Sequence, residues 1–187
     1  MGEEEWSKRF EIPENDFSFN VHQTNDDGYI FTSRKDNADI IFVKVNSQGE
    51  EEWTHTVLEG GSGTIEYPSD IEVVSDGYLI AAVNNFIKLD LAGNPVWTKT
   101  TDLKINNILP ISDGNYLLVS TPDFIGGQHL SKRTPDGAEI WKSTVDDVGG
   151  DTRTVQIVEL DDGGFLLVDV RNEFGMGIIY NLSLIHI

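Results

Sequence analysis

A glycine followed four positions later by tryptophan occurs four times along the chain and accounts for every tryptophan in it. The tryptophans fall at intervals of 47, 44 and 44 residues. A period of about 20 to 50 residues is typical of arrays in which each repeat forms one supersecondary unit. The chain is therefore expected to be built from successive copies of one such unit. The paired markers are Gly2 and Trp6, Gly49 and Trp53, Gly93 and Trp97, and Gly137 and Trp141.

A second marker, an Asp-Gly turn leading into an aromatic residue, runs in phase with the first. Asp-Gly between apolar runs is a strong hairpin signal, because glycine accepts the positive φ that tight turns require. Each copy therefore predicts a turn between two strands. The four copies are Asp27-Gly28-Tyr29, Asp76-Gly77-Tyr78, Asp113-Gly114-Asn115-Tyr116 and Asp162-Gly163-Gly164-Phe165.

The second repeat shows four strands most clearly. Its segments 69–74, 78–83, 86–91 and 95–100 favour a pleated, buried surface, and no segment of the chain shows a sustained helical period. Asn84-Asn85 is the expected tight turn between the second and third strands. Four antiparallel strands in a repeat of about 44 residues are typical of a β-propeller blade.

The predicted fold class is all-β: a partial β-propeller of four-stranded antiparallel blades within a single domain, 1–187. Residues 1–10 are expected to form the last strand of a preceding blade. The final blade is expected to stop after its third strand, which leaves an open arc because most rings need more blades. The expected blades cover about 11–57, 58–101, 102–145 and 146–181.

The recurring tryptophans are expected to pack between neighbouring blades, since radial repetition puts equivalent residues in equivalent places. The alternative is a stacking platform for sugars or bases. The structural repeat residues are Trp6, Trp53, Trp97, Trp141, Gly49, Gly93 and Gly137.

The stretches 88–97 and 45–53, with 134–141 as a looser copy, run from a strand through a glycine turn to tryptophan. They resemble the tryptophan-docked blades of the quinoprotein-like propeller superfamily. The chain also resembles secreted or surface-anchored bacterial propellers, whose glycine-rich loops are similar to Gly60-Gly61-Ser62-Gly63. The resemblance implies an extracytoplasmic location: periplasm, cell surface or medium.

The same resemblance implies an enzymatic alternative, an alcohol dehydrogenase that uses pyrroloquinoline quinone. The chain has no cysteine, so it lacks the adjacent cysteine pair that those enzymes often place at the cofactor. No acidic cluster matches their calcium ligands. We therefore predict no cofactor and no enzymatic activity for this chain.

The formal net charge of −19 argues against nucleic acid as a partner, because a phosphate backbone would be repelled. No apolar run approaches the roughly 20 residues that span a bilayer, so no membrane insertion is expected. A protein or a carbohydrate is the expected kind of partner.

Binding residues usually lie on loops that vary over a rigid scaffold. The loops between the second and third strands vary in length here, with long ones expected near 34–39, 122–127 and 171–175. The alternative is ordinary surface loops that bind nothing. Candidate contacts from this reasoning are Arg34, Lys35, Phe124, Arg153, Arg171 and Phe174.

Asp146, Asp147 and Asp151 lie close together in sequence and could offer oxygens to calcium, but their spacing fits no EF-hand loop. His22, His55 and His129 occupy different repeat positions without zinc-site spacing. No metal site is predicted.

Residues 182–187 resemble a reading frame through sequencing-adapter DNA; the alternative is a native strand, which their apolar alternation permits. Three functional hypotheses follow. The first is a non-enzymatic extracytoplasmic scaffold for protein or carbohydrate binding. The other two are a fragment of a quinoprotein-like enzyme and a purely structural repeat of a larger surface protein.

Overall fold

A computed structural model gives the fold in which these expectations can be checked. Every secondary-structure element in the described part of the chain is a β-strand or a turn. No described helix is long and apolar enough to cross a membrane. The structure describes residues 3, 6–10, 18–35, 39–58, 68–122, 127–145, 151–173 and 177–185.

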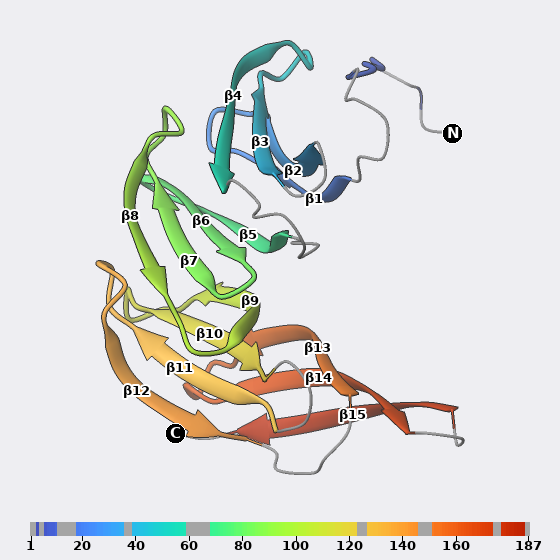
Figure 1. The fold of residues 1–187 in the computed structure, drawn as a ribbon, viewed down its shortest axis with the longest axis vertical. Coiled ribbons are helices and arrows are strands. Elements are labelled where there is room, and N and C mark those ends of the chain that lie inside the picture. The colour runs from blue at the N-terminus through green and yellow to red at the C-terminus, as the bar shows by residue number, and fades with distance from the viewer. Residues whose placement is uncertain are drawn as a thin grey trace. The chain divides into compact units, whose positions relative to one another are not determined.

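The strands form separate antiparallel sheets in which each strand pairs with the next one along the chain (Figure 1). The first sheet contains β1 (Ser18–Gln23), β2 (Tyr29–Lys35), β3 (Asp39–Val45) and β4 (Glu51–Leu58). The second contains β5 (Pro68–Val74), β6 (Gly77–Ala82), β7 (Asn85–Leu89) and β8 (Pro95–Thr100). The third contains β9 (Lys104–Pro110), β10 (Tyr116–Thr121), β11 (His129–Arg133) and β12 (Glu139–Thr144). The fourth has three strands, β13 (Asp151–Glu159), β14 (Phe165–Glu173) and β15 (Gly177–Ile185).

The predicted strands of the second repeat are confirmed within two residues at each end, and β8 matches exactly the expected 95–100. The turn between β6 and β7 lies at Val83-Asn84 rather than at Asn84-Asn85. Asn85 belongs to β7, and its side-chain oxygen accepts a hydrogen bond from the Thr100 hydroxyl at 3.1 Å. Val83 consequently takes a φ of 54°, a conformation that β-branched residues rarely adopt.

The two ends of the repeat array differ from expectation. Residues 6–10 form no strand, although a strand was expected over 1–10. A strand needs a neighbouring strand to satisfy its backbone hydrogen-bonding groups. None of the described sheets contains residues 6–10. At the other end, β15 continues to Ile185, past the expected end at 181. The origin of residues 182–187 stays a prediction.

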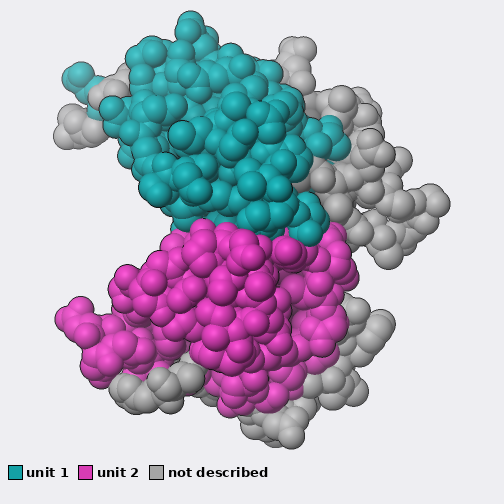
Figure 2. Space-filling view, turned by 90° about the vertical axis from the view of Figure 1, so that its left-hand side faces the viewer, with its two compact units in different colours: residues 1–82, 87–98 teal, residues 83–86, 99–187 magenta. Residues whose placement is uncertain are grey.

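The chain divides into two compact units, shown in different colours in Figure 2. Unit 1 contains residues 1–82 and 87–98, and unit 2 contains residues 83–86 and 99–187. Among the described strands, β15 forms the edge of its sheet, and no pairing joins that sheet to another. The sheets are therefore not closed by strand pairing.

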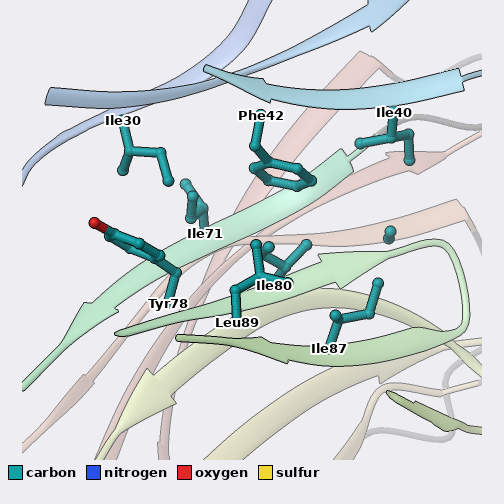
Figure 3. Packing of buried hydrophobic residues seen from close by; sticks show 9 residues of the cluster. Ile30, Ile40, Phe42, Ile71, Tyr78, Ile80, Ile87 and Leu89 are labelled. Carbon is teal, nitrogen blue, oxygen red and sulfur yellow. The ribbon is translucent and has the colours of Figure 1, made fainter. Parts of the chain in front are cut away.

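The core of unit 1 lies between the first and second sheets. Ile30, Ile40 and Phe42 project from the first sheet onto Ile71 and Ile80 of the second, and all five are fully buried (Figure 3). Burying such side chains stabilises the fold by about 1.5 to 3 kcal/mol each. As expected for a strand covered on both faces, every residue of β6 is buried.

The core of unit 2 repeats this arrangement between the third and fourth sheets. Leu117, Val119 and Leu130 of the third sheet form a cluster with Ile157 and Leu167 of the fourth. Successive side chains of a strand point to opposite faces, so each sheet can pack against a neighbour on either side.

Candidate functional site

Of the six predicted contact residues, four lie in described strands, but the side chain of none of the six is described. Phe124 and Phe174 are not described, and the loop-face site stays a prediction. Arg34 and Lys35 belong to β2, Arg153 to β13 and Arg171 to β14, with side chains that are not described. The loops expected at 34–39 and 171–175 are therefore shorter than predicted, because their hairpin strands run further.

Two tryptophans of unit 1, Trp53 and Trp6, each pack against the aromatic residue that follows a turn of a neighbouring sheet. The ring of Trp53, at β4, meets that of Tyr78 edge-on at 5.9 Å and packs against the core. A Cβ built on Gly93 would lie 3.0 Å from the Trp53 ring, so only glycine leaves room for it. Trp6 makes the same contacts one repeat earlier: its ring is 5.9 Å from Tyr29, and it lies over Gly49.

A tryptophan of unit 2 packs against the neighbouring sheet in the same way. Trp141, at β12, packs against the cluster that contains Phe165, the aromatic residue after the corresponding Asp-Gly turn. Trp97 occupies the equivalent place in β8 and is half-buried. Trp53 and Trp141 thus both take part in packing between two sheets of the same unit.

Each four-stranded sheet also carries a lysine in its third strand that binds an aspartate in the turn between its own first two strands. Lys44 binds Asp26 at 2.9 Å and Glu52 at 2.6 Å, and its side chain is only 2% exposed. Lys88 pairs with Asp76 in the second sheet. Lys132 pairs with Asp113 in the third. Together with the tryptophan contacts, these pairs form the repeated framework of the molecule.

The ion pairs fix the charge states of the turn. A hydrogen bond from the Thr24 hydroxyl and the pairing with Lys44 lower the pKa of Asp26 to about 2. Burial opposes the charge of Lys44, but its bonds to Glu52 and Asp26 outweigh this effect and raise its pKa. The lysine is therefore charged although it is buried, and it depends on its two carboxylates.

Removing both carboxylates with Asp26→Asn and Glu52→Gln should lower the free energy of unfolding by about 2 to 3 kcal/mol, because a buried charge is left without a partner. Adding Lys44→Met to the double variant should restore most of this loss, since an apolar side chain of similar length needs no counter-charge. Urea denaturation of the double and triple variants measures both effects. Equal stability of the two variants would contradict the assignment.

The first strand of every sheet contains a one-residue bulge, which sequence analysis did not predict. The register shifts beside Asn20 in β1, Asp70 in β5, Asn107 in β9 and Gln156 in β13. Each of these polar residues immediately precedes an apolar one: Val21, Ile71, Ile108 and Ile157. Bulges occur preferentially at sheet edges and beside functional sites, where they redirect side chains. We call these four residues the bulge residues.

In unit 1 the bulge residues join two first strands. The Asn20 side-chain amide donates a hydrogen bond to the backbone oxygen of Ser69 at 3.3 Å. Ser69 is the extra residue of the β5 bulge, whose backbone groups the regular ladder leaves unpaired. Asp70 accepts a bond from the Ile71 amide at 2.9 Å. Asn20 and Asp70 are both half-buried, and they place an amide and a carboxylate at the bulges of two first strands.

In unit 2 one bulge residue keeps a free acceptor. The Asn107 side-chain oxygen is buried and has no hydrogen-bond partner among the described residues. Its neighbour Asn106 donates to the Thr121 hydroxyl at 3.0 Å. A buried acceptor without a partner is a place where a water or ligand donor would be favoured.

Glu72 lies two residues after Asp70 on β5. Burial, reinforced by the charge of Asp70, raises the pKa of Glu72 to about 7. In the unfolded chain the group titrates near its ordinary value of 4.5, so the folded state binds the proton more tightly. Stability therefore falls as pH rises through the interval between these values.

The free energy of unfolding should drop by about 1 kcal/mol between pH 5 and pH 8, after allowance for the exposed part of the Glu72 side chain. Glu72→Gln removes the titrating group and should flatten that part of the profile. Urea denaturation at several pH values measures the slope. An unchanged slope in the variant would show that Glu72 titrates normally.

No group of three or more His, Asp or Glu side chains in the described residues is placed to hold a metal ion. Asp146 and Asp147 lie outside the described residues, and Asp151 is the first residue of β13. The four bulge residues share a sequence feature, since each is a polar residue just before a Val or Ile of a first strand, but this feature does not by itself indicate a bulge.

Solved structures share this arrangement of sheets. BamB from Moraxella catarrhalis, a β-propeller, superposes with a TM-score of 0.51 at 15% identity, over 87% of this chain and 48% of that one. The fold is that of a partial β-propeller. The sheets are its blades.

Two further structures show the same likeness. A protein of unknown function from Bacteroides caccae gives a TM-score of 0.60 at 14% identity, over 93% of this chain and 63% of that one. The extracellular domain of a B. thetaiotaomicron protein described as a hybrid two-component system, BT3049, gives 0.52 at 14% identity, over 87% and 22%. No family model and no curated protein matches the chain. The propeller thus spans less than two thirds of each structure named here.

Proposed function

We propose that this propeller is a non-enzymatic extracytoplasmic scaffold that binds a protein or carbohydrate partner along the first strands of its blades. The observation that supports it is a contrast between two sets of equivalent positions. The framework lysine and tryptophan recur in each four-stranded blade, whereas the residue two positions after each bulge residue in the first strand differs in every blade. These residues are His22, Glu72, Leu109 and Val158.

A position that varies on a fixed scaffold is where recognition can be specified without loss of the fold. In a complete propeller the blades surround a central channel, and polar groups on the channel side are available to a ligand. On the first strands, the bulge residues offer carboxamide and carboxylate groups. These groups suit hydroxyl-rich sugars and the peptide backbone, both of which offer donors and acceptors.

The extracytoplasmic location rests on the kinds of protein that share the fold, one of which is an extracellular domain. At sequence identities of 14–15%, the partners and activities of those proteins cannot be transferred to this chain. The quinoprotein-like enzyme stays an alternative, and absorbance from a bound quinone in a longer natural form of the protein would favour it.

A photo-crosslinking residue at Gln156, which is exposed beside the β13 bulge, tests the protein arm with a bacterial periplasmic extract as the probe. The matched control carries it at Ile140, 48% exposed on β12 in the same unit. A defined crosslinked protein at 156 and not at 140 supports the proposal.

Affinity electrophoresis in gels that contain xylan, mannan or laminarin tests the carbohydrate arm. Retardation that Asn107→Ala or Gln156→Ala abolishes, and Ile140→Ala does not, supports it. If neither arm gives a signal specific to the bulge residues, the binding function is overturned and a purely structural repeat remains.

A further inference from the structure

The framework lysines of the first two blades lie in the same local structure. Lys44 and Lys88 stand at the same distance in sequence before the tryptophan of their own blade. The turn after each lysine is closed by the same two bonds: the amide of its first residue donates to the oxygen of the fifth, and the amide of the fourth donates to the oxygen of the first. Glu52 and Val96, which immediately precede the two tryptophans, are therefore equivalent as well.

The two lysines differ in the hydrogen bonds that their ammonium groups make. Lys44 Nζ donates to two carboxylates and to a backbone oxygen, at 2.6 to 3.1 Å. An ammonium has three donors, so this set is complete. Among the described residues, Lys88 Nζ donates to Asp76 alone. Glu52 supplies the second carboxylate in the first blade, and the second blade has Val96 in its place.

Lys88 is buried although it makes this smaller set of bonds. Its side chain is 4% exposed, whereas that of its partner Asp76 is 74% exposed, so the ammonium lies directly below the surface. Val96 is 58% exposed and has no acceptor to offer. A buried charge with unmade hydrogen bonds costs free energy that a further acceptor would recover.

We propose that Lys88 binds a glutamate side chain from a second protein, whose extended segment lies against Val96 and places its carboxylate as Glu52 places its own beside Lys44. The first blade is the precedent for the charges, since one buried lysine there holds two carboxylates. The site belongs to the third and fourth strands of the second blade. It goes beyond the first-strand binding proposed above and does not depend on it.

The surface beside this lysine favours a peptide over an acidic sugar. Leu91, in the turn between β7 and β8, and Val96 are both exposed apolar residues of the same hairpin. A glutamate flanked by apolar residues can cover such a surface while its carboxylate meets the ammonium. A uronic acid would bring hydroxyl groups against apolar side chains, where they lose hydrogen bonds to water.

Val96→Glu supplies the carboxylate within the chain and tests the acceptor position without any ligand. The variant should have a higher urea midpoint of unfolding than the parent, because the new side chain can reach Lys88 as Glu52 reaches Lys44. Val96→Gln has the same length and no charge, and should leave the midpoint at or below that of the parent. A midpoint for Val96→Glu no higher than that of Val96→Gln would overturn the proposal.

Binding in trans is measured on the full chain by heteronuclear NMR at constant ionic strength. The probe is the peptide acetyl-Gly-Val-Glu-Val-Gly-amide, and its glutamine counterpart is the control. The glutamate peptide should shift the amide signals of Lys88 and Val96 to saturation, and the glutamine peptide should not. Val96→Glu should abolish the shifts, because a carboxylate within the chain outcompetes a weakly bound one.

Four results of the titration would overturn the proposal. Equal shifts with the glutamine peptide would indicate a purely apolar contact, and shifts that persist in Val96→Glu would place the binding elsewhere. Shifts with trigalacturonate but not with the glutamate peptide would indicate a carbohydrate partner. No shift with any probe would leave Lys88 a purely structural residue. Crosslinking at Gln156 reports on the first strands alone, so the two proposals can fail separately.

Discussion

Trp53→Ala should lower the free energy of unfolding by about 3 kcal/mol, near the lower end for tryptophan truncation because the ring is half-buried. The substitution removes the ring that meets Tyr78 edge-on and that packs against the core between the first two blades. Urea denaturation followed by circular dichroism measures the change without relying on tryptophan fluorescence.

Trp6→Ala is the matched control for this substitution. Trp6 makes the same contact with Tyr29 but is 41% exposed, so its loss should cost only about 1 kcal/mol. Equal losses for the two variants would show that the contact with the neighbouring tyrosine, rather than the deeper burial of Trp53, sets the cost.

Gly93→Ala should cost about 3 kcal/mol, of which about 1 comes from the backbone and the rest from crowding. Gly93 has a φ of +81°, and a Cβ there would lie 2.5 Å from the His55 ring and 3.0 Å from Trp53. The Trp53 ring cannot move far because it is held against Tyr78. The His55 ring is held by a 3.2 Å contact with the backbone oxygen of Ala92.

Gly114→Ala separates the two contributions to that cost. Gly114 has nearly the same φ, +84°, but nothing lies within 4 Å of its built Cβ. It should therefore lose only the backbone part, about 1 kcal/mol. If Gly93→Ala costs no more than Gly114→Ala in the same denaturation experiment, the seat for Trp53 is not tightly packed.

Several features of the fold could be predicted from particular residues. The Asp-Gly turns placed the start of each second strand: glycine takes the positive φ at Gly77, Gly114 and Gly163, and Asp27 takes it in the first turn. The alternation of apolar side chains in the second repeat located its four strands to within two residues. The even spacing of Trp53, Trp97 and Trp141 indicated a shared environment, and the contacts of Trp53 and Trp141 have that character.

The candidate site was harder to predict. Arg34 and Arg171 were expected in loops between the second and third strands, yet both lie in strands that pairing with the next strand extends. The bulge at Asn20, Asp70, Asn107 and Gln156 adds one residue to one strand relative to its partner. That mismatch is a property of two segments together and is not visible in either segment alone.

By itself, the sequence determined the all-β class, the repeat period and the recurring position of tryptophan, because these depend on turn chemistry and on the pattern of apolar residues along one strand. Only the tertiary structure decided that Lys44 is buried between two carboxylates, that burial raises the pKa of Glu72 to about 7, and that Val21 is exposed. Burial, charge pairing and open edges depend on which segments meet in space, and a linear pattern does not contain that information.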